Sequence, residues 1–268
     1  MELGLGAYTK NLNTIEELEE ICHDISLELR RYLTGIQSSF EATPVIRERF
    51  IQQLCSPHSF LSGGNARAIS RFLGHARDTL NYNIMSFNYT NCIESLFATD
   101  GKISFPIPIA QGHYLHSLHH IHQTLSNQDI ITGVNDDGQI ANAELLCDDC
   151  RDLLVKPHIL NQLRTLVDEE CTRLIDEADL FVLFGVSLGE SDSIWWERIG
   201  KRMTHSTALL IYFAYDNDNP RFSNELIRKT RYYTSLMMNR CKVVQEKGIP
   251  AVAERLFIGY KTQFFKLK

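Results

Sequence analysis

The sequence lacks several features that would place it in a protein class at once. It contains no run of about 20 uninterrupted apolar residues, so no helix is expected to span a bilayer. Its 27 basic residues are outnumbered by 33 acidic ones, which gives a net charge of −6 and disfavours nucleic-acid binding through a broadly basic surface. No basic segment followed by an apolar one stands at the start, so we expect no secretion signal, no membrane partner and a cytoplasmic location.

Cysteines are few, and their number argues against a disulfide framework. The seven cysteines are an odd number and are scattered along the chain, which is typical of reduced thiols that pack as small apolar groups. Cys147 and Cys150 form a single CxxC pair, and no second pair of matching spacing accompanies it. One such pair is a weak indication of zinc, so we expect no metal site.

The remaining composition is that of an ordinary globular protein, with 44% hydrophobic and 22% charged residues. We expect a single domain over residues 1–268. Apolar residues recur every three or four positions over 14–34, which predicts a helix that Thr14 and Glu17 cap and that Gly35 ends. Further helix is predicted over 44–80, with a turn at 62–65.

The pattern changes to that of strands at 82–88. Residues 99–112 contain two prolines and indicate a loop or an edge ribbon. A pair of strands is predicted at 118–125 and 129–134, and an irregular segment at 135–157.

The second half alternates more clearly between helix and strand. Its predicted helices cover 158–175, 191–203 and a long segment from Asn219-Pro220 to about 246, and its predicted strands cover 180–184, 208–213 and 255–265. Strand–helix–strand order implies right-handed crossovers and parallel strands. The predicted fold class is therefore α/β: a Rossmann-like parallel sheet flanked by helices, with helical insertions.

Three motifs could carry chemistry. The first is Gly185-Val-Ser-Leu-Gly-Glu-Ser-Asp192, between a buried strand and a helix, where ligands of parallel sheets bind and where free backbone N–H groups suit a phosphate. Ser187 could bond a ribose or phosphate oxygen, whereas Asp192 could bond a ligand or cap the helix. A plain strand–helix turn is an equally good reading of this motif. No Gly-Lys-Ser/Thr follows, so it is not a Walker loop.

The second motif is Ser86-Phe-Asn-Tyr-Thr-Asn91, which also follows a predicted strand. The side-chain amide of Asn88 can both donate and accept, which suits the holding of a water molecule or a sugar hydroxyl. The alternative is a turn whose asparagines bond to their own backbone.

The third motif is a group of five histidines between His113 and His122. Such a group can hold a metal, supply one general base or be purely structural. In a strand, His120 and His122 would lie on the same face.

Together with Gly133-Val-Asn-Asp136, these motifs resemble the bacterial abortive-infection AbiH family and, more distantly, the sirtuin-like NAD-consuming domains of anti-phage systems. The resemblance covers roughly residues 80–215. It implies a Rossmann-like pocket for NAD as the substrate and cleavage of its nicotinamide–ribose bond. By this resemblance, Asn88 positions the attacking water or ribose and His122 is the general base. The dinucleotide site is assigned to Gly185, Ser187, Asp192, Thr90 and Glu94.

The chain departs from the family pattern at three places. Gln123 stands where a glycine usually follows the catalytic histidine, and Val186 replaces a polar residue. These families also begin with a strand and a Gly-rich turn, and residues 2–9 resemble the portion that follows such a turn.

The resemblance implies an NAD⁺ glycohydrolase of an anti-phage system. Because unregulated depletion of NAD⁺ would kill the host, we expect control by homo-oligomerisation or by a sensor subunit. The alternatives are a non-catalytic nucleotide-binding or scaffold subunit of a defence complex, and a metal-dependent hydrolase or nuclease that uses the histidines. A sirtuin-type deacetylase is disfavoured, since its two CxxC pairs are not present.

Overall fold

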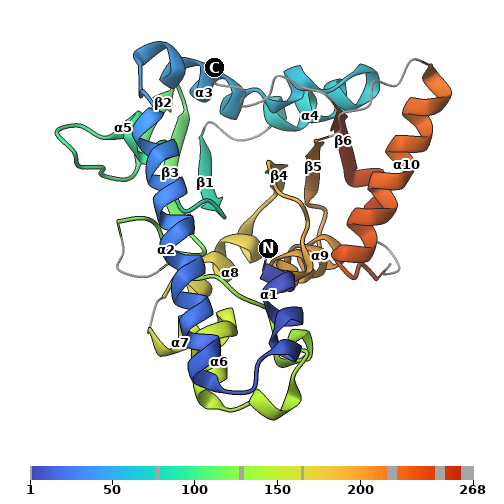
Figure 1. Ribbon diagram of the computed structural model, residues 1–268. Helices are drawn as coiled ribbons and strands as arrows, with labels where there is room; N and C mark the ends of the chain where they lie inside the picture. The colour runs from blue at the N-terminus through green and yellow to red at the C-terminus, as the bar shows by residue number, and fades with distance from the viewer. Residues whose placement is uncertain are drawn as a thin grey trace.

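The computed structural model describes residues 2–75, 79–126, 130–163, 166–215, 222–244 and 251–260. Within them, two small sheets are flanked by helices (Figure 1), so the predicted α/β class is confirmed. The expected single sheet is divided into two three-stranded sheets, because no strand pairing among the described residues joins one to the other.

The first sheet has the order β1-β3-β2. Strand β1 (Leu80–Ser86) pairs in parallel with β3 (His113–His120), and β2 (Ile107–Ala110) adds to β3 in antiparallel orientation. The predicted strand at 82–88 and the predicted edge ribbon are confirmed. The expected pair at 118–125 and 129–134 is wrong. Strand β3 ends at His120, and beyond it Gln123 adopts a left-handed φ of 66° that extended strands do not contain.

The second sheet consists of β4 (Leu180–Phe184), β5 (Leu209–Ala214) and β6 (Leu256–Tyr260), all parallel and in sequential order. Helix α9 (Ser193–His205) connects the first two strands, and α10 (Ser223–Arg240) lies between the last two. All three predicted strands are confirmed where the chain is described. Residues 216–221, 245–250 and 261–268, on which parts of the last predicted helix and strand fall, lie outside the described residues.

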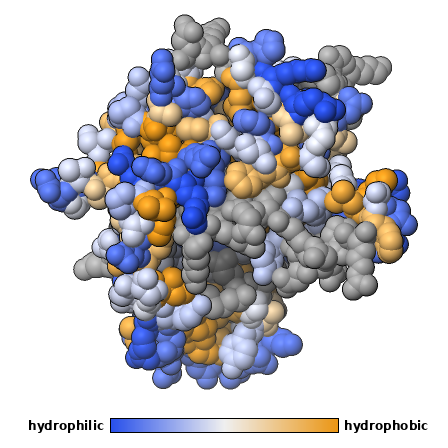
Figure 2. Space-filling view, turned by 90° about the horizontal axis from the view of Figure 1, so that it is seen from above, coloured by the Kyte–Doolittle hydropathy of each residue, from blue (hydrophilic) through white to orange (hydrophobic). Residues whose placement is uncertain are grey.

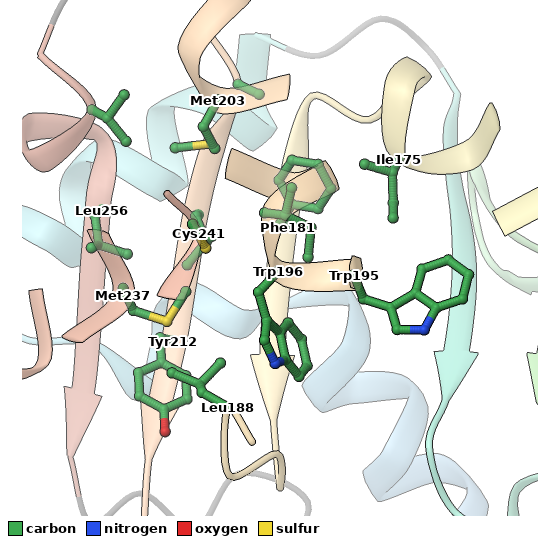
Figure 3. Packing of buried hydrophobic residues seen from close by; sticks show 14 of the residues in the cluster. Ile175, Phe181, Leu188, Trp195, Trp196, Met203, Tyr212, Met237, Cys241 and Leu256 are labelled. Carbon is green, nitrogen blue, oxygen red and sulfur yellow. The ribbon is translucent and has the colours of Figure 1, made fainter. Parts of the chain in front are cut away.

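Strands β5 and β6 are buried on both faces, because successive side chains point in opposite directions and both faces are covered. Strand β4 lies at the edge of the sheet, and its predicted burial on both faces is wrong, since Val182 and Phe184 are 37% and 39% exposed. Leu210 and Tyr212 of β5 belong to one apolar cluster, whereas Ile211 and Phe213 pack against Ile69 of α4 (Gly63–His75). Figure 3 shows the first cluster, which contains Trp195 and Trp196 of α9 together with side chains of α8 (Val167–Glu177), the three strands and the end of α10. This packing explains the continuous apolar run of β5.

The N-terminal third is helical. Helix α1 (Glu2–Tyr8) leads through η1 (Thr9–Asn11) to α2 (Ile15–Ser39), where Thr14 Oγ1 accepts from the Glu17 amide at 3.3 Å as the capping pattern predicts. The helix continues past Gly35, so its predicted end is wrong; the last turn is anchored by Gln37, whose side chain accepts from the Asn91 amide. The predicted helix at 44–80 is α3 (Pro44–Cys55) and α4, separated by η2 (Pro57–Phe60).

Short helices fill the middle of the chain. They are α5 (Cys92–Phe97), η3 (Asp137–Gln139), η4 (Ala143–Leu145), α6 (Asp148–Leu154) and α7 (Lys156–Gln162); η5 (Glu190–Asp192) and η6 (Val252–Arg255) lie further along. The segment 135–157 is thus more helical than predicted, because Cys150 and Leu154 of α6 pack against Leu18 of α2. The predicted helix at 158–175 is divided into α7 and α8.

On the surface, small apolar groups are interspersed with hydrophilic ones (Figure 2). Leu226 and Ile227 of α10 are among the exposed apolar residues. No helix in the described ranges combines the length and the apolar character that crossing a membrane requires.

Candidate functional site

The segments that follow β1, β3 and β4 meet at the carboxyl ends of these strands. The ring of Phe87, just after β1, stacks on Trp196 of α9 with centroids 5.3 Å apart. The same ring lies 5.7 Å from the imidazole of His122, which follows β3. The structure thereby brings together the three motifs that the sequence singles out.

His122 is buried, with 3% of its surface exposed, between the rings of Phe87 and Tyr89. Its Nε2 lies 3.0 Å from Oδ1 of Asp192. A carboxylate only accepts, so the neutral imidazole carries its proton on Nε2 and leaves Nδ1 as a proton acceptor. This Nδ1 is buried and has no hydrogen-bond partner among the described residues. His122 therefore has the form that a general base requires.

Asp192 also binds a buried cation. The Nζ of Lys156, a residue that is 3% exposed, lies 2.7 Å from the same Oδ1. Burial by itself raises the pKa of Asp192, but the hydrogen bonds from His122 and Lys156 and the positive charge of Lys156 outweigh it and lower the pKa below its ordinary value. The carboxylate is therefore ionised and balances the charge of Lys156. The helix-capping role weighed for Asp192 is wrong, because its side chain makes no capping hydrogen bond to α9.

Lys156 reaches this position because its backbone docks on the segment 133–136. The Val134 amide donates to Leu154 O at 2.8 Å, and the Lys156 amide donates to Val134 O at 2.9 Å. Gly133 makes the approach possible: its φ is 142°, and a Cβ at this position would lie 2.1 Å from Leu154 O. Lys156 was not among the predicted site residues, although a lysine inside the apolar run Leu-Leu-Val-Lys-Pro was a visible signal.

A cavity of about 20 Å³ adjoins these side chains. Its polar lining includes His122, Asn135, Lys156, Ser191 and Asp192. This volume is enough for about one water molecule, and the lining offers both donors and acceptors to it.

The second group of polar side chains surrounds Asn88. The Asn88 carbonyl accepts from Nδ1 of His120 at 2.8 Å, and Nε2 of His120 lies 2.6 Å from Oε1 of Glu94. The side chain of Asn88 is exposed and makes no hydrogen bond to the described residues. Thr90 is half-buried. Glu94, which we predicted to bind the dinucleotide, is engaged with His120.

The turn after β4 leaves its backbone open. Gly185 has a φ of 67° and Ser187 is exposed, and a Cβ at Gly185 would meet no atom within 4 Å. Leu188 is buried although its φ is 53°, and Gly189 O accepts from the Trp196 indole at 2.9 Å. A left-handed non-glycine residue stores strain, and such strain is common at functional sites.

The five histidines do not form one cluster. His113 stacks on Tyr82 and bonds to its hydroxyl through Nδ1 at 2.8 Å, and His116 is exposed. His120 and His122 bind different carboxylates, so the expected shared strand face is wrong, because His122 lies beyond the end of β3. In the described ranges, no group of three or more His, Cys, Asp or Glu residues is arranged to hold a metal ion.

Comparison with known protein families gives a match over most of the chain. The model of the family described as "Bacteriophage abortive infection AbiH" matches residues 6–213, which is more than half of the chain and includes every candidate site residue. No curated protein and no solved structure gives a significant match.

Proposed function

This chain belongs to the bacteriophage abortive infection AbiH family, and from that premise we propose that it acts as an NAD⁺ glycohydrolase in the anti-phage role of the family. The substrate would be NAD⁺ and the products nicotinamide and ADP-ribose. The observation that carries the proposal is the pairing of His122 with Asp192 beside the Asn88 turn.

The reaction needs little from the protein beyond orientation and one base. The bond between C1′ of the ribose and the nicotinamide nitrogen breaks, and its electron pair stays on that nitrogen, which becomes neutral. A water oxygen bonds to the cationic, oxocarbenium-like C1′, and the proton of the water passes to Nδ1 of His122. Asp192 holds the imidazole in the tautomer that leaves Nδ1 free to accept.

The other predicted residues have supporting roles in this proposal. The amide of Asn88 orients the water or the ribose. Gly185 and Ser187 line the dinucleotide, since both are exposed and the backbone there is open to close approach. Lys156 compensates the charge of Asp192. Control of the activity is assigned to a sensor subunit or to homo-oligomerisation.

The burial of His122 favours one second candidate, a non-catalytic nucleotide-binding or scaffold subunit of a defence complex. Calorimetry with NAD⁺ and ADP-ribose separates the two: binding without turnover supports the second candidate, and turnover supports the first.

The proposal is tested by purifying the protein, with any copurifying partner, and adding NAD⁺ with and without a lysate of phage-infected cells. We expect release of nicotinamide and ADP-ribose by the wild type and by His116→Gln, which changes an exposed histidine of β3. His122→Gln should lose at least about 100-fold in rate, as general-base variants do. Equal rates for His122→Gln and the wild type would contradict the assigned base.

A further inference from the structure

We propose that Glu94 and His120 are positioning residues that hold the turn at residues 87–91, which contains Asn88, in the conformation that the reaction requires. The inference rests on the proposed NAD⁺ hydrolysis, in which the amide of Asn88 orients the reacting groups.

The contacts of His120 define the pair. Its side chain is 9% exposed and contacts Glu94, whose side chain is 22% exposed, through Nε2, and the Asn88 carbonyl through Nδ1. A carbonyl oxygen only accepts, so Nδ1 carries a proton; an ionised Glu94 likewise accepts from Nε2. With both ring nitrogens donating, His120 is an imidazolium ion paired with a carboxylate.

Glu94 is itself held by Asn91, which other residues hold in turn. The Asn91 side-chain amide donates to Glu94 Oε1 at 3.4 Å, and the Asn91 backbone amide donates to Gln37 of α2 at 2.7 Å. Ser126 Oγ donates to Asn91 Oδ1 at 3.2 Å. The pair therefore connects the Asn88 turn to α2, α5 and the segment after β3.

The position of the Asn88 amide depends on this backbone anchoring. Because the side chain of Asn88 bonds to none of the described residues, only the backbone of the turn places it. A displacement of about 1 Å at a reacting group can cost about 100-fold in rate. The His120–Asn88 bond is thus a determinant of kcat rather than of substrate affinity.

The pairing also depends on pH. Burial by itself lowers the pKa of His120, but the hydrogen bond and charge of Glu94 and the Asn88 carbonyl outweigh it and raise the pKa above its ordinary value. His119 on the same strand is a titratable neighbour of His120, and burial lowers the pKa of His119. With a raised pKa in the fold, the pair is complete below about pH 6.5 and is lost as the pH rises through the higher folded value.

The test measures amide exchange and turnover on the intact protein. We expect the protection factors of amides 87–91 to fall as the pH rises, and to fall about tenfold in Glu94→Gln already at pH 6, because the neutral amide cannot pair with the imidazolium. Glu94→Gln should also lower kcat with little change in KM, whereas His116→Gln, on the same strand, should change neither quantity.

Each outcome decides a separate point. Unchanged protection in Glu94→Gln, or a wild-type turn whose protection ignores pH, overturns the pairing. Lost protection with unchanged kcat overturns the positioning role. A wild type that releases no nicotinamide, while protection still responds to Glu94→Gln, overturns the proposed function and leaves the pairing intact.

Discussion

Lys156 and His122 reach the same oxygen atom: Nζ of the lysine lies 2.7 Å and Nε2 of the histidine 3.0 Å from Oδ1 of Asp192. The three residues come from α7, from the turn after β3 and from η5. One half-buried carboxylate thus connects the middle of the chain to the second sheet.

Removal of the buried cation should destabilise the protein strongly. Lys156→Met leaves Asp192 without its cation, and a broken buried ion pair costs about 3–5 kcal/mol. Urea unfolding of this variant should show that loss. Lys102→Met, which changes an exposed lysine, is the matched control and should stay within about 0.5 kcal/mol of the wild type. A similarly small effect at Lys156 would refute the importance of the pair.

The contribution of Asp192 should depend on pH in a defined direction. Its pKa is lowered in the fold, so its stabilising effect is present above the unfolded value of about 3.9 and is lost as the pH falls through the folded pKa. The difference in unfolding free energy between the wild type and Asp192→Asn should therefore shrink below about pH 4. Chemical denaturation at a series of pH values checks this, and a difference that grows toward acid pH contradicts it.

Gln123→Gly should stabilise the protein slightly. The left-handed φ of 66° costs a non-glycine residue about 1–2 kcal/mol, and glycine loses about 0.5–1 kcal/mol through the entropy of the unfolded chain. The net gain should be below about 1 kcal/mol, measured by thermal unfolding. Gln52→Gly in α3 is the opposite case and should lose about 1 kcal/mol. If both variants lose stability equally, the strain assigned to Gln123 is absent.

Gly133→Ala should be costly. A Cβ would collide with Leu154 O and would meet a φ that alanine disfavours, so we expect a loss of at least about 2 kcal/mol and displacement of Lys156. Gly35→Ala serves as the control, since a Cβ there meets no atom within 4 Å inside α2; it should gain about 0.5–1 kcal/mol. Differential scanning calorimetry of both variants measures these changes in stability. A Gly133→Ala variant as stable as the wild type would contradict the close approach of Gly133 to Leu154 O.

The second sheet could be predicted because its signal is local. A continuous apolar run such as 209–213 of β5 follows from burial on both faces, and the capping of α2 follows from Thr14 and Glu17. The break between α7 and α8 could not be predicted by periodicity, because Leu163 and Leu166 continue the apolar pattern yet are 48% and 72% exposed.

The site was predictable only in part for a different reason. Asn88 and His122 follow strands, and that placement indicates a common edge of the sheet. Lys156 reaches the site through a backbone pairing with Val134, and nothing in the local sequence of either residue encodes that contact. The contact between Glu94 and His120 was not predicted because 26 positions separate the two residues, and local sequence does not encode such a contact.

The most direct test of the enzymatic account is the NAD⁺ content of phage-infected cells that carry this chain. Mass spectrometry should show that NAD⁺ falls, and nicotinamide and ADP-ribose rise, after infection of cells with the wild type or His116→Gln, whereas cells with His122→Gln keep their NAD⁺ and lose protection. Constant NAD⁺ in wild-type cells that nevertheless resist the phage would contradict the account.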